Sequence, residues 1–104
     1  MEQFEITETD AGYNLTLAPI LDFGTAKSLR AYLLGLLPLG KSIALDASQV
    51  ERMSTPCVQV ILAAAKSFEE KNIDFSLSKP TQTFVNAFDD LGLFSVLLNW
   101  KIET

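Results

Sequence analysis

Segments with the two-residue period of β-strands alternate along this chain with segments that have the spacing of α-helices, and this alternation constrains the fold more than any other feature. Residues 3–7 (QFEIT) and 13–18 (YNLTLA) alternate apolar and polar side chains, as half-buried strands do. Residues 24–40 and 80–92 repeat apolar residues at helical spacing. Strands that alternate with helices pair in parallel through right-handed crossovers, so the pattern predicts an α/β domain.

The first two strand segments are joined by a short connection that favours a turn. Asp10 and Gly12 lie in it, and both residue types are common in tight turns. We therefore expect a β-hairpin at one edge of the sheet. Its inward-facing residues are expected to be Phe4, Ile6, Tyr13, Leu15 and Leu17.

The helix predicted over residues 24–40 is followed by a strand. Pro38 and Gly40 end the helix, because these two residue types are the usual helix-stop signals. The continuous apolar run from Ile43 to Leu45 is typical of a central strand covered on both faces. The apolar stripe of the helix comprises Leu29, Leu33, Leu36 and Leu37.

Residues 53–63 (MSTPCVQVILA) contain two hydroxyl side chains, a proline and the chain's only cysteine. A long apolar run follows them immediately. Thr55 is predicted to cap a second helix and Pro56 to be its first residue, because proline's missing N–H costs nothing there. Only Gln59 interrupts the apolar run, so most of this helix should be packed. Cys57 is expected to be a small buried apolar residue, because no histidine is present to act as base for a cysteine nucleophile.

The last third of the chain should add a strand over residues 73–78 and a helix over 80–92. Pro80 stands near the start of this helix and Gly92 just past its end. Residues 93–104 fit either a short helix or a final strand. The inward-facing residues of the strand and the helix are expected to be Ile73, Phe75, Leu77, Phe84, Phe88 and Leu91.

The predicted order is therefore β-β-α-β-α-β-α in a single domain over residues 1–104. We expect a mixed sheet of four or five strands with helices packed mainly on one face. The net charge is −5, from 13 acids and 8 bases. Because the bases are dispersed along the sequence, they form no cluster that would bind nucleic acid or an anionic membrane surface.

The composition also excludes several kinds of site. No apolar stretch reaches the roughly 20 residues of a membrane span, and the acidic, alternating N-terminal segment is unlike a signal peptide, so we expect a cytoplasmic protein. The chain has no histidine and one cysteine, which removes the commonest general base and the commonest metal ligand. We expect no enzymatic activity, no cofactor and no metal site; the oligomeric state and nucleotide binding are left open.

Residues 45–65 (LDASQVERMSTPCVQVILAAA) resemble the signature of STAS domains, the family of anti-sigma-factor antagonists. Members have an apolar strand, an aspartate, a short loop with Ser and Val, and an Asp-Ser-Ser-Gly-like motif that opens an apolar helix. The predicted order of strands and helices also fits this family over nearly the whole chain. The chain is most similar to small STAS proteins found with bacterial chemotaxis genes. The matching residues are Asp46, Ser48, Val50, Met53, Val58, Val60, Ile61 and Leu62.

This resemblance implies a signalling module in which a partner kinase phosphorylates a hydroxyl at the helix start and so switches binding partners. Aligned without a gap, Ser54 stands on the motif aspartate, Thr55 on the first serine, Pro56 on the usual phosphoacceptor and Cys57 on the glycine. Proline cannot be phosphorylated. One hypothesis is that Thr55, or next to it Ser54, has taken over the switch. The other is that the domain binds its partner without a switch, and we favour this one.

The resemblance also implies which proteins and residues are involved. The expected partner is an anti-sigma factor of the serine/threonine-kinase type or a chemotaxis component. The alternative is a STAS subunit of a lipid-transport ABC system, which docks on an ATPase. Asp46 is expected to end its strand and accept N–H groups of the loop, as its family counterpart does. The partner-binding residues are expected to be Ser48, Gln49, Glu51, Arg52, Pro56, Cys57 and Gln59.

Overall fold

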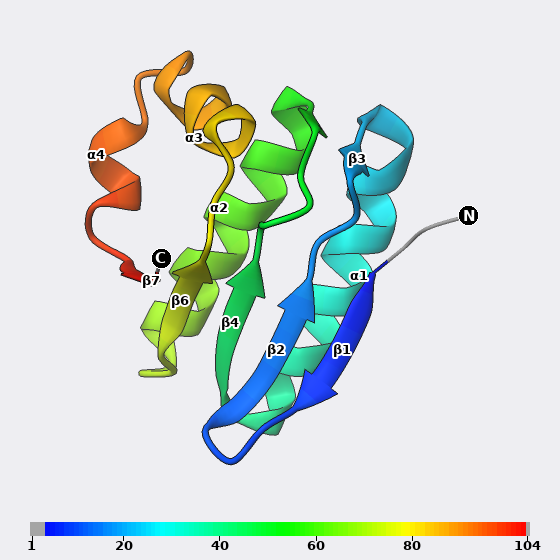
Figure 1. Cartoon of the computed structure of the whole chain (residues 1–104). Helices are drawn as coiled ribbons and strands as arrows, with labels where there is room; N and C mark the ends of the chain where they lie inside the picture. Colours follow the sequence, from blue (N-terminus) through cyan, green and yellow to red (C-terminus); the bar gives the residue numbers. More distant parts are fainter. Residues whose placement is uncertain (1–3, 104) are drawn as a thin grey trace.

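The main sheet has five strands in the order β1-β2-β4-β6-β7, and the computed structural model describes it within residues 4–103 (Figure 1). β1 and β2 pair antiparallel, and every other neighbouring pair is parallel. This confirms the predicted mixed sheet with a hairpin at its edge. The strands are β1 (Glu5–Glu8), β2 (Gly12–Thr16), β4 (Ser42–Asp46), β6 (Phe75–Ser78) and β7 (Lys101–Glu103).

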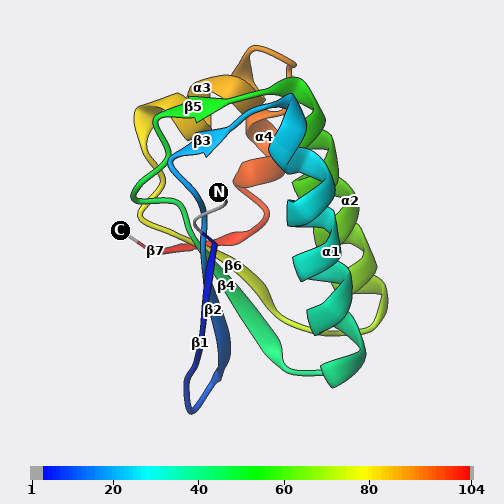
Figure 2. The same ribbon diagram turned by 90° about the vertical axis from the view of Figure 1, so that its right-hand side faces the viewer.

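The two long helices lie side by side on one face of this sheet (Figure 2). They are α1 (Ala26–Leu36) and α2 (Thr55–Glu70). α3 (Gln82–Asp89) lies above the carboxyl ends of β4 and β6, and α4 (Phe94–Leu97) leads into β7 (Figure 1). The tail therefore contains both a helix and a strand, the two possibilities between which the sequence did not decide. Short 3-10 turns precede and follow α1, as η1 (Phe23–Thr25) and η2 (Leu37–Leu39).

The core lies between the sheet and these helices. Alternate strand residues point toward α1 and α2 and are buried, and they meet buried residues of both helices. Burial of apolar surface against the sheet is the main force that holds the layers together. The principal core residues are Leu15, Leu29, Leu33, Ile43, Leu45, Ile61, Phe68, Phe75, Leu77, Phe84 and Phe88.

The central strand β4 is covered on one face only, so the prediction of cover on both faces was wrong. Ala44 pairs in register with Asn14 on one side and Ser76 on the other, and all three are partly exposed. Within residues 4–103, no helix covers that face (Figure 2). The small polar neighbours across the sheet, and not the apolar run within β4, decide that this face meets solvent.

The edge hairpin needs glycine at its turn. Gly12 has φ +152°, and a Cβ built there would lie 2.1 Å from the carbonyl oxygen of Ser42. Only a residue without a side chain allows this close approach of two backbones. Because β1 is an edge strand, its Ile6 is 40% exposed. Leu15 in β2 and Leu17 just after β2, which we also expected to face inward, are fully buried.

A second, two-stranded sheet was not predicted. β3 (Ile20–Leu21) pairs in parallel with β5 (Arg52–Met53). It joins the segment after β2 to the segment that follows β4. This small sheet fixes the path of the chain into α2.

The C-terminal third differs from the prediction at Leu91, which is 43% exposed. α3 ends at Asp89, and a turn with Gly92 at φ +73° follows. Leu91 therefore lies beyond α3 and is not part of the apolar stripe of this helix, which consists of Phe84 and Phe88.

Candidate functional site

The loop that leaves β4 is held on one side by the segment around β3. The carbonyl oxygen of Pro19 accepts the N–H groups of Glu51 at 2.8 Å and Arg52 at 3.1 Å. The N–H of Ser54 donates to the carbonyl oxygen of Leu21 at 2.8 Å. These bonds, together with the β3–β5 pairing, fix the backbone over residues 51–54.

The other side of the same loop is held by the segment between β6 and α3. The N–H of Ala47 donates to the carbonyl oxygen of Ser78 at 2.9 Å. The hydroxyl of Thr81 donates to the carbonyl oxygen of Val50 at 2.8 Å. Ala47 and Val50 are both buried, so they anchor the loop in the core.

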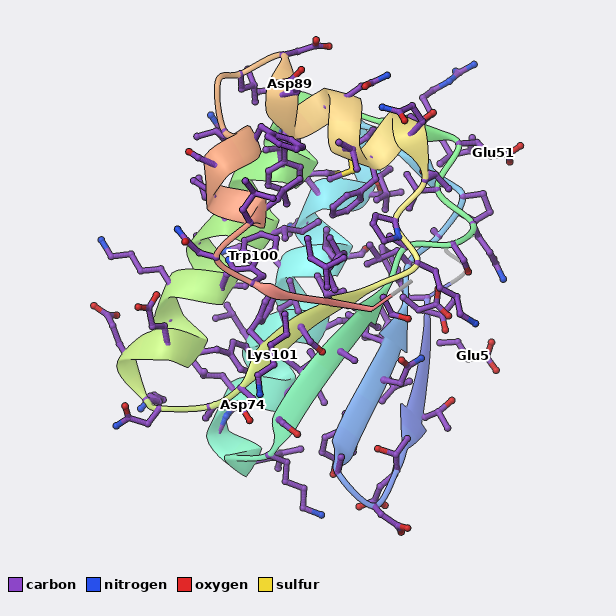
Figure 3. The ribbon with its side chains drawn as sticks, turned by 60° about the vertical axis from the view of Figure 1, so that its left-hand side comes forward. Glu5, Glu51, Asp74, Asp89, Trp100 and Lys101 are labelled. Carbon is purple, nitrogen blue, oxygen red and sulfur yellow. The ribbon has the colours of Figure 1, made fainter. Side chains whose placement is uncertain are left out.

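Asp46 ends β4 and organises the first turn of the loop. Its carboxylate Oδ1 accepts the N–H of Ser48 at 2.9 Å, as expected for this residue. Beyond this bond, the loop turns its polar side chains to solvent, and Glu51 projects away from the body of the molecule (Figure 3). We call the exposed set the polar loop surface; it consists of Ser48, Gln49, Glu51, Arg52 and Thr55.

The start of α2 is one residue earlier than predicted. Ser54 is the N-cap, with extended backbone (φ −90°, ψ 158°), and Thr55 and Pro56 are the first two helical residues. The carbonyl oxygen of Ser54 accepts the N–H groups of Cys57 at 3.1 Å and Val58 at 3.2 Å. The reason is tertiary, because the hydrogen bond of the Ser54 N–H to the β3 segment keeps this residue extended.

The two hydroxyls at this helix start differ sharply in accessibility. The Ser54 side chain makes no capping hydrogen bond. Its Oγ is the one buried side-chain oxygen or nitrogen without a hydrogen-bond partner among the residues that the structure describes. Thr55 is exposed. A kinase must reach the acceptor oxygen, so Thr55 is the better placed of the two candidate phosphorylation residues.

Cys57 does not lie on the surface, which corrects its assignment to the partner contact. Its side chain is 0% exposed, and its Sγ lies 3.3 Å from the carbonyl oxygen of Asp22 and 3.8 Å from the hydroxyl of Thr25. The expectation of a small buried residue is confirmed. Of its neighbours, Pro56 is partly exposed and Gln59 is exposed.

Sequence reasoning missed Phe23, which is 81% exposed. It belongs to η1, directly after Asp22, whose carbonyl oxygen accepts the thiol of Cys57, so it lies next to the start of α2. Ile20, in register with Arg52 in the small sheet, is 39% exposed. The available signal was an aromatic residue that stands between an aspartate and a glycine, outside any strand or helix period.

Within residues 4–103, no three His, Cys, Asp or Glu side chains come together in a way that would hold a metal ion. In the same part of the chain, the longest helices are too short or too polar to pass through a lipid bilayer.

Comparison with known families assigns the chain as a whole. The family model described as "Mlab, STAS domain" matches residues 4–100. The protein therefore belongs to the STAS domain family. No curated protein sequence gives a significant match.

Solved structures with this fold include a STAS domain protein and two forms of SpoIIAA. A STAS domain protein from Planctomyces limnophilus superposes with a TM-score of 0.81 at 13% identity, over 100% of this chain and 91% of that chain. The anti-sigma factor antagonist SpoIIAA in its unphosphorylated form superposes with a TM-score of 0.78 at 18% identity, over 98% of this chain and 88% of that chain. The Bacillus cell fate determinant SpoIIAA in its phosphorylated form superposes with a TM-score of 0.78 at 20% identity, over 98% of this chain and 91% of that chain. At these identities the similarity concerns the fold.

Proposed function

We propose that this protein is a non-catalytic cytoplasmic signalling module that binds a partner protein through residues 48–59. The partner class is an anti-sigma factor of the serine/threonine-kinase type or a chemotaxis component. The observation that supports this is the polar loop surface, whose backbone is hydrogen-bonded from two sides while its side chains are exposed. A surface that is rigid before binding loses less conformational entropy when a partner docks.

Binding is proposed to occur without the phosphorylation switch of the family. Pro56 stands where the resemblance places the phosphoacceptor, and it has no hydroxyl. Thr55 is the alternative acceptor because it is exposed at the start of a 16-residue helix. A phosphate there would add nearly two negative charges next to the positive end of the helix dipole, which favours it electrostatically.

A pull-down with wild type and Thr55→Glu distinguishes these two versions. Unswitched binding predicts the same partners for both proteins. Thr83→Glu is the matched control, because Thr83 is also an exposed threonine in the first turn of a helix. Loss of one partner with Thr55→Glu alone would support a switch, and mass spectrometry that finds phosphate on Thr55 after incubation with the captured kinase would refute the unswitched version.

The location of the contact is tested by exchanging the charges at its centre. Glu51→Lys combined with Arg52→Glu keeps the net charge and leaves both backbone bonds to Pro19 in place. We expect this variant to lose the captured partner while its unfolding curve stays unchanged. Full retention of the partner would place the contact elsewhere on the molecule.

The alternative partner is the ATPase of a lipid-transport ABC system. The same pull-down decides between the two, because capture of such an ATPase would favour the alternative and capture of a kinase or chemotaxis protein the main proposal. Neighbouring genes give a second, independent criterion. A permease and an ATPase beside this gene favour the transporter, and chemotaxis genes favour the signalling role.

A further inference from the structure

A groove of about 430 Å³ runs between α1 and α2 on the solvent side of the helical layer. The two helices lie side by side on one face of the sheet (Figure 2), and the groove is on their side that faces away from the sheet. α1 contributes Leu33 and Leu34 to the groove, with Arg30 on its rim. α2 contributes Val60, Ala63 and Ala64.

The shape of this groove suits a third helix. Val60, Ala63 and Ala64 follow the i, i+3, i+4 spacing, and so do Arg30, Leu33 and Leu34 on α1. Each set is therefore a stripe along its helix, and two neighbouring stripes form a trough into which the side chains of another helix pack. Leu34 is 45% exposed and Ala63 is exposed, so the trough is open to a partner.

Arg30 lines the groove, and the two helices that form it carry charges of the opposite sign to the protein as a whole up to Glu69. α1 contains no acidic residue, and α2 contains none before Glu69 near its end. The charged residues of these stretches are the exposed bases Lys27, Arg30 and Lys66. The helical layer thus contains three of the chain's 8 bases and, up to Glu69, none of its 13 acids, on a protein of net charge −5.

We infer that this groove binds an amphipathic helix of a partner protein whose polar flanks are acidic. The apolar stripe of that helix would fill the trough, and its carboxylates would pair with Arg30 and be attracted by Lys27 and Lys66 on the same two helices. The inference rests on the proposed function, because the groove reaches Pro56 and Gln59 at the start of α2. It gives the partner a second, apolar contact next to the polar loop surface.

Two other occupants fit less well. A symmetric dimer through this groove would bring Arg30 close to the Arg30 of a second copy, and like charges at short distance repel. A lipid surface would have to contact a concave trough, and anionic lipids would meet Glu69 and Glu70 at one end of α2. A helix fits the concave shape of the trough, and its acidic flanks need to reach only Arg30 and the part of α2 that precedes Glu69.

Two matched peptides test the charge preference directly. Both are labelled helices of about 18 residues, or five turns, with the same leucine and alanine stripe, and their other positions are either Glu or Lys. Fluorescence anisotropy should show the Glu peptide binding about tenfold more tightly than the Lys peptide. The net charge of −5 alone would give the reverse order, so tighter binding of the Lys peptide, or binding of neither, would overturn the inference.

Variants then locate the binding. Arg30→Glu should remove the preference for the Glu peptide, whereas Lys79→Glu, with the same charge change at an exposed residue outside the groove, should keep it. Ala63→Trp should block the trough while the exposed position leaves stability unchanged. Unaltered peptide binding in both groove variants would refute the location.

Three further measurements separate the competing explanations. Vesicles of phosphatidylglycerol and phosphatidylcholine should not compete with the Glu peptide; competition would mean that the groove binds a membrane and not a helix. Sedimentation should show no dimer that depends on Arg30; such a dimer would mean that the groove binds a second copy of the chain. The Glu51 and Arg52 exchange should leave peptide binding intact. If Arg30→Glu abolishes peptide binding but leaves capture of the natural partner unchanged, the inference fails while the proposed function stands.

Discussion

The hydroxyl of Thr81 donates a 2.8 Å hydrogen bond to the carbonyl oxygen of Val50, 31 residues away in the chain. The same hydroxyl accepts the N–H of Phe84 at 3.2 Å and so caps α3. One side chain thus holds the start of α3 and the polar loop surface together. Stability of the helix and order in the loop should therefore change together when this hydroxyl is removed.

Thr81→Ala should lower the free energy of unfolding by about 1 to 2 kcal/mol, because it removes an N-cap bond and leaves the Val50 carbonyl without its partner. Urea denaturation measures this loss. Amide exchange should also become faster at Glu51, next to the released carbonyl. Thr81→Ser keeps the hydroxyl and should preserve both properties; an unchanged exchange rate in the alanine variant would show that the loop does not depend on this bond.

Ser54→Ala should behave differently although Ser54 is also an N-cap. Its Oγ makes no capping bond and is buried without a partner, so its removal should lower the free energy of unfolding by less than about 0.5 kcal/mol. The same urea experiment compares it with Thr81→Ala. A loss of about 1 kcal/mol or more would mean that the hydroxyl is bonded in solution.

Cys57 should react slowly with a thiol reagent in the native protein. The side chain is 0% exposed, so labelling requires opening of the core, and we expect a rate at least about a thousandfold below that of the urea-unfolded chain. Because the chain has one cysteine, the signal has a single source. Rapid labelling at neutral pH in the folded state would contradict the observed burial.

Phe23→Ala should weaken partner binding without affecting the fold. Phe23 is 81% exposed, so the free energy of unfolding should change by less than about 0.5 kcal/mol. Aromatic residues on a contact surface often contribute strongly to binding, and a loss of about tenfold or more in partner affinity is expected. Leu98→Ala, at a residue 62% exposed in the C-terminal segment, is the control and should bind normally; equal binding of both variants would remove Phe23 from the contact.

The periodic elements of the fold were predictable because they depend on local pattern. The strand and helix periods gave the order of elements, and buried positions such as Leu15 and Phe84 followed from the same periods. β3 was not predictable in this way, because a two-residue strand such as Ile20–Leu21 is too short to show a period. The cap at Ser54 was placed one residue late because a hydrogen bond from a distant segment, and not helix propensity, keeps that residue extended.

The sequence by itself determined which residues can share a face of a strand or helix, since that depends on backbone geometry alone. Only the tertiary structure decided that the Oγ of Ser54 is buried and Phe23 exposed, because burial depends on which distant elements pack against a residue. It also decided the charge of the helical layer. Lys27, Arg30 and Lys66 are dispersed in the sequence, and they come into one layer because α1 and α2 pack side by side on the same face of the sheet.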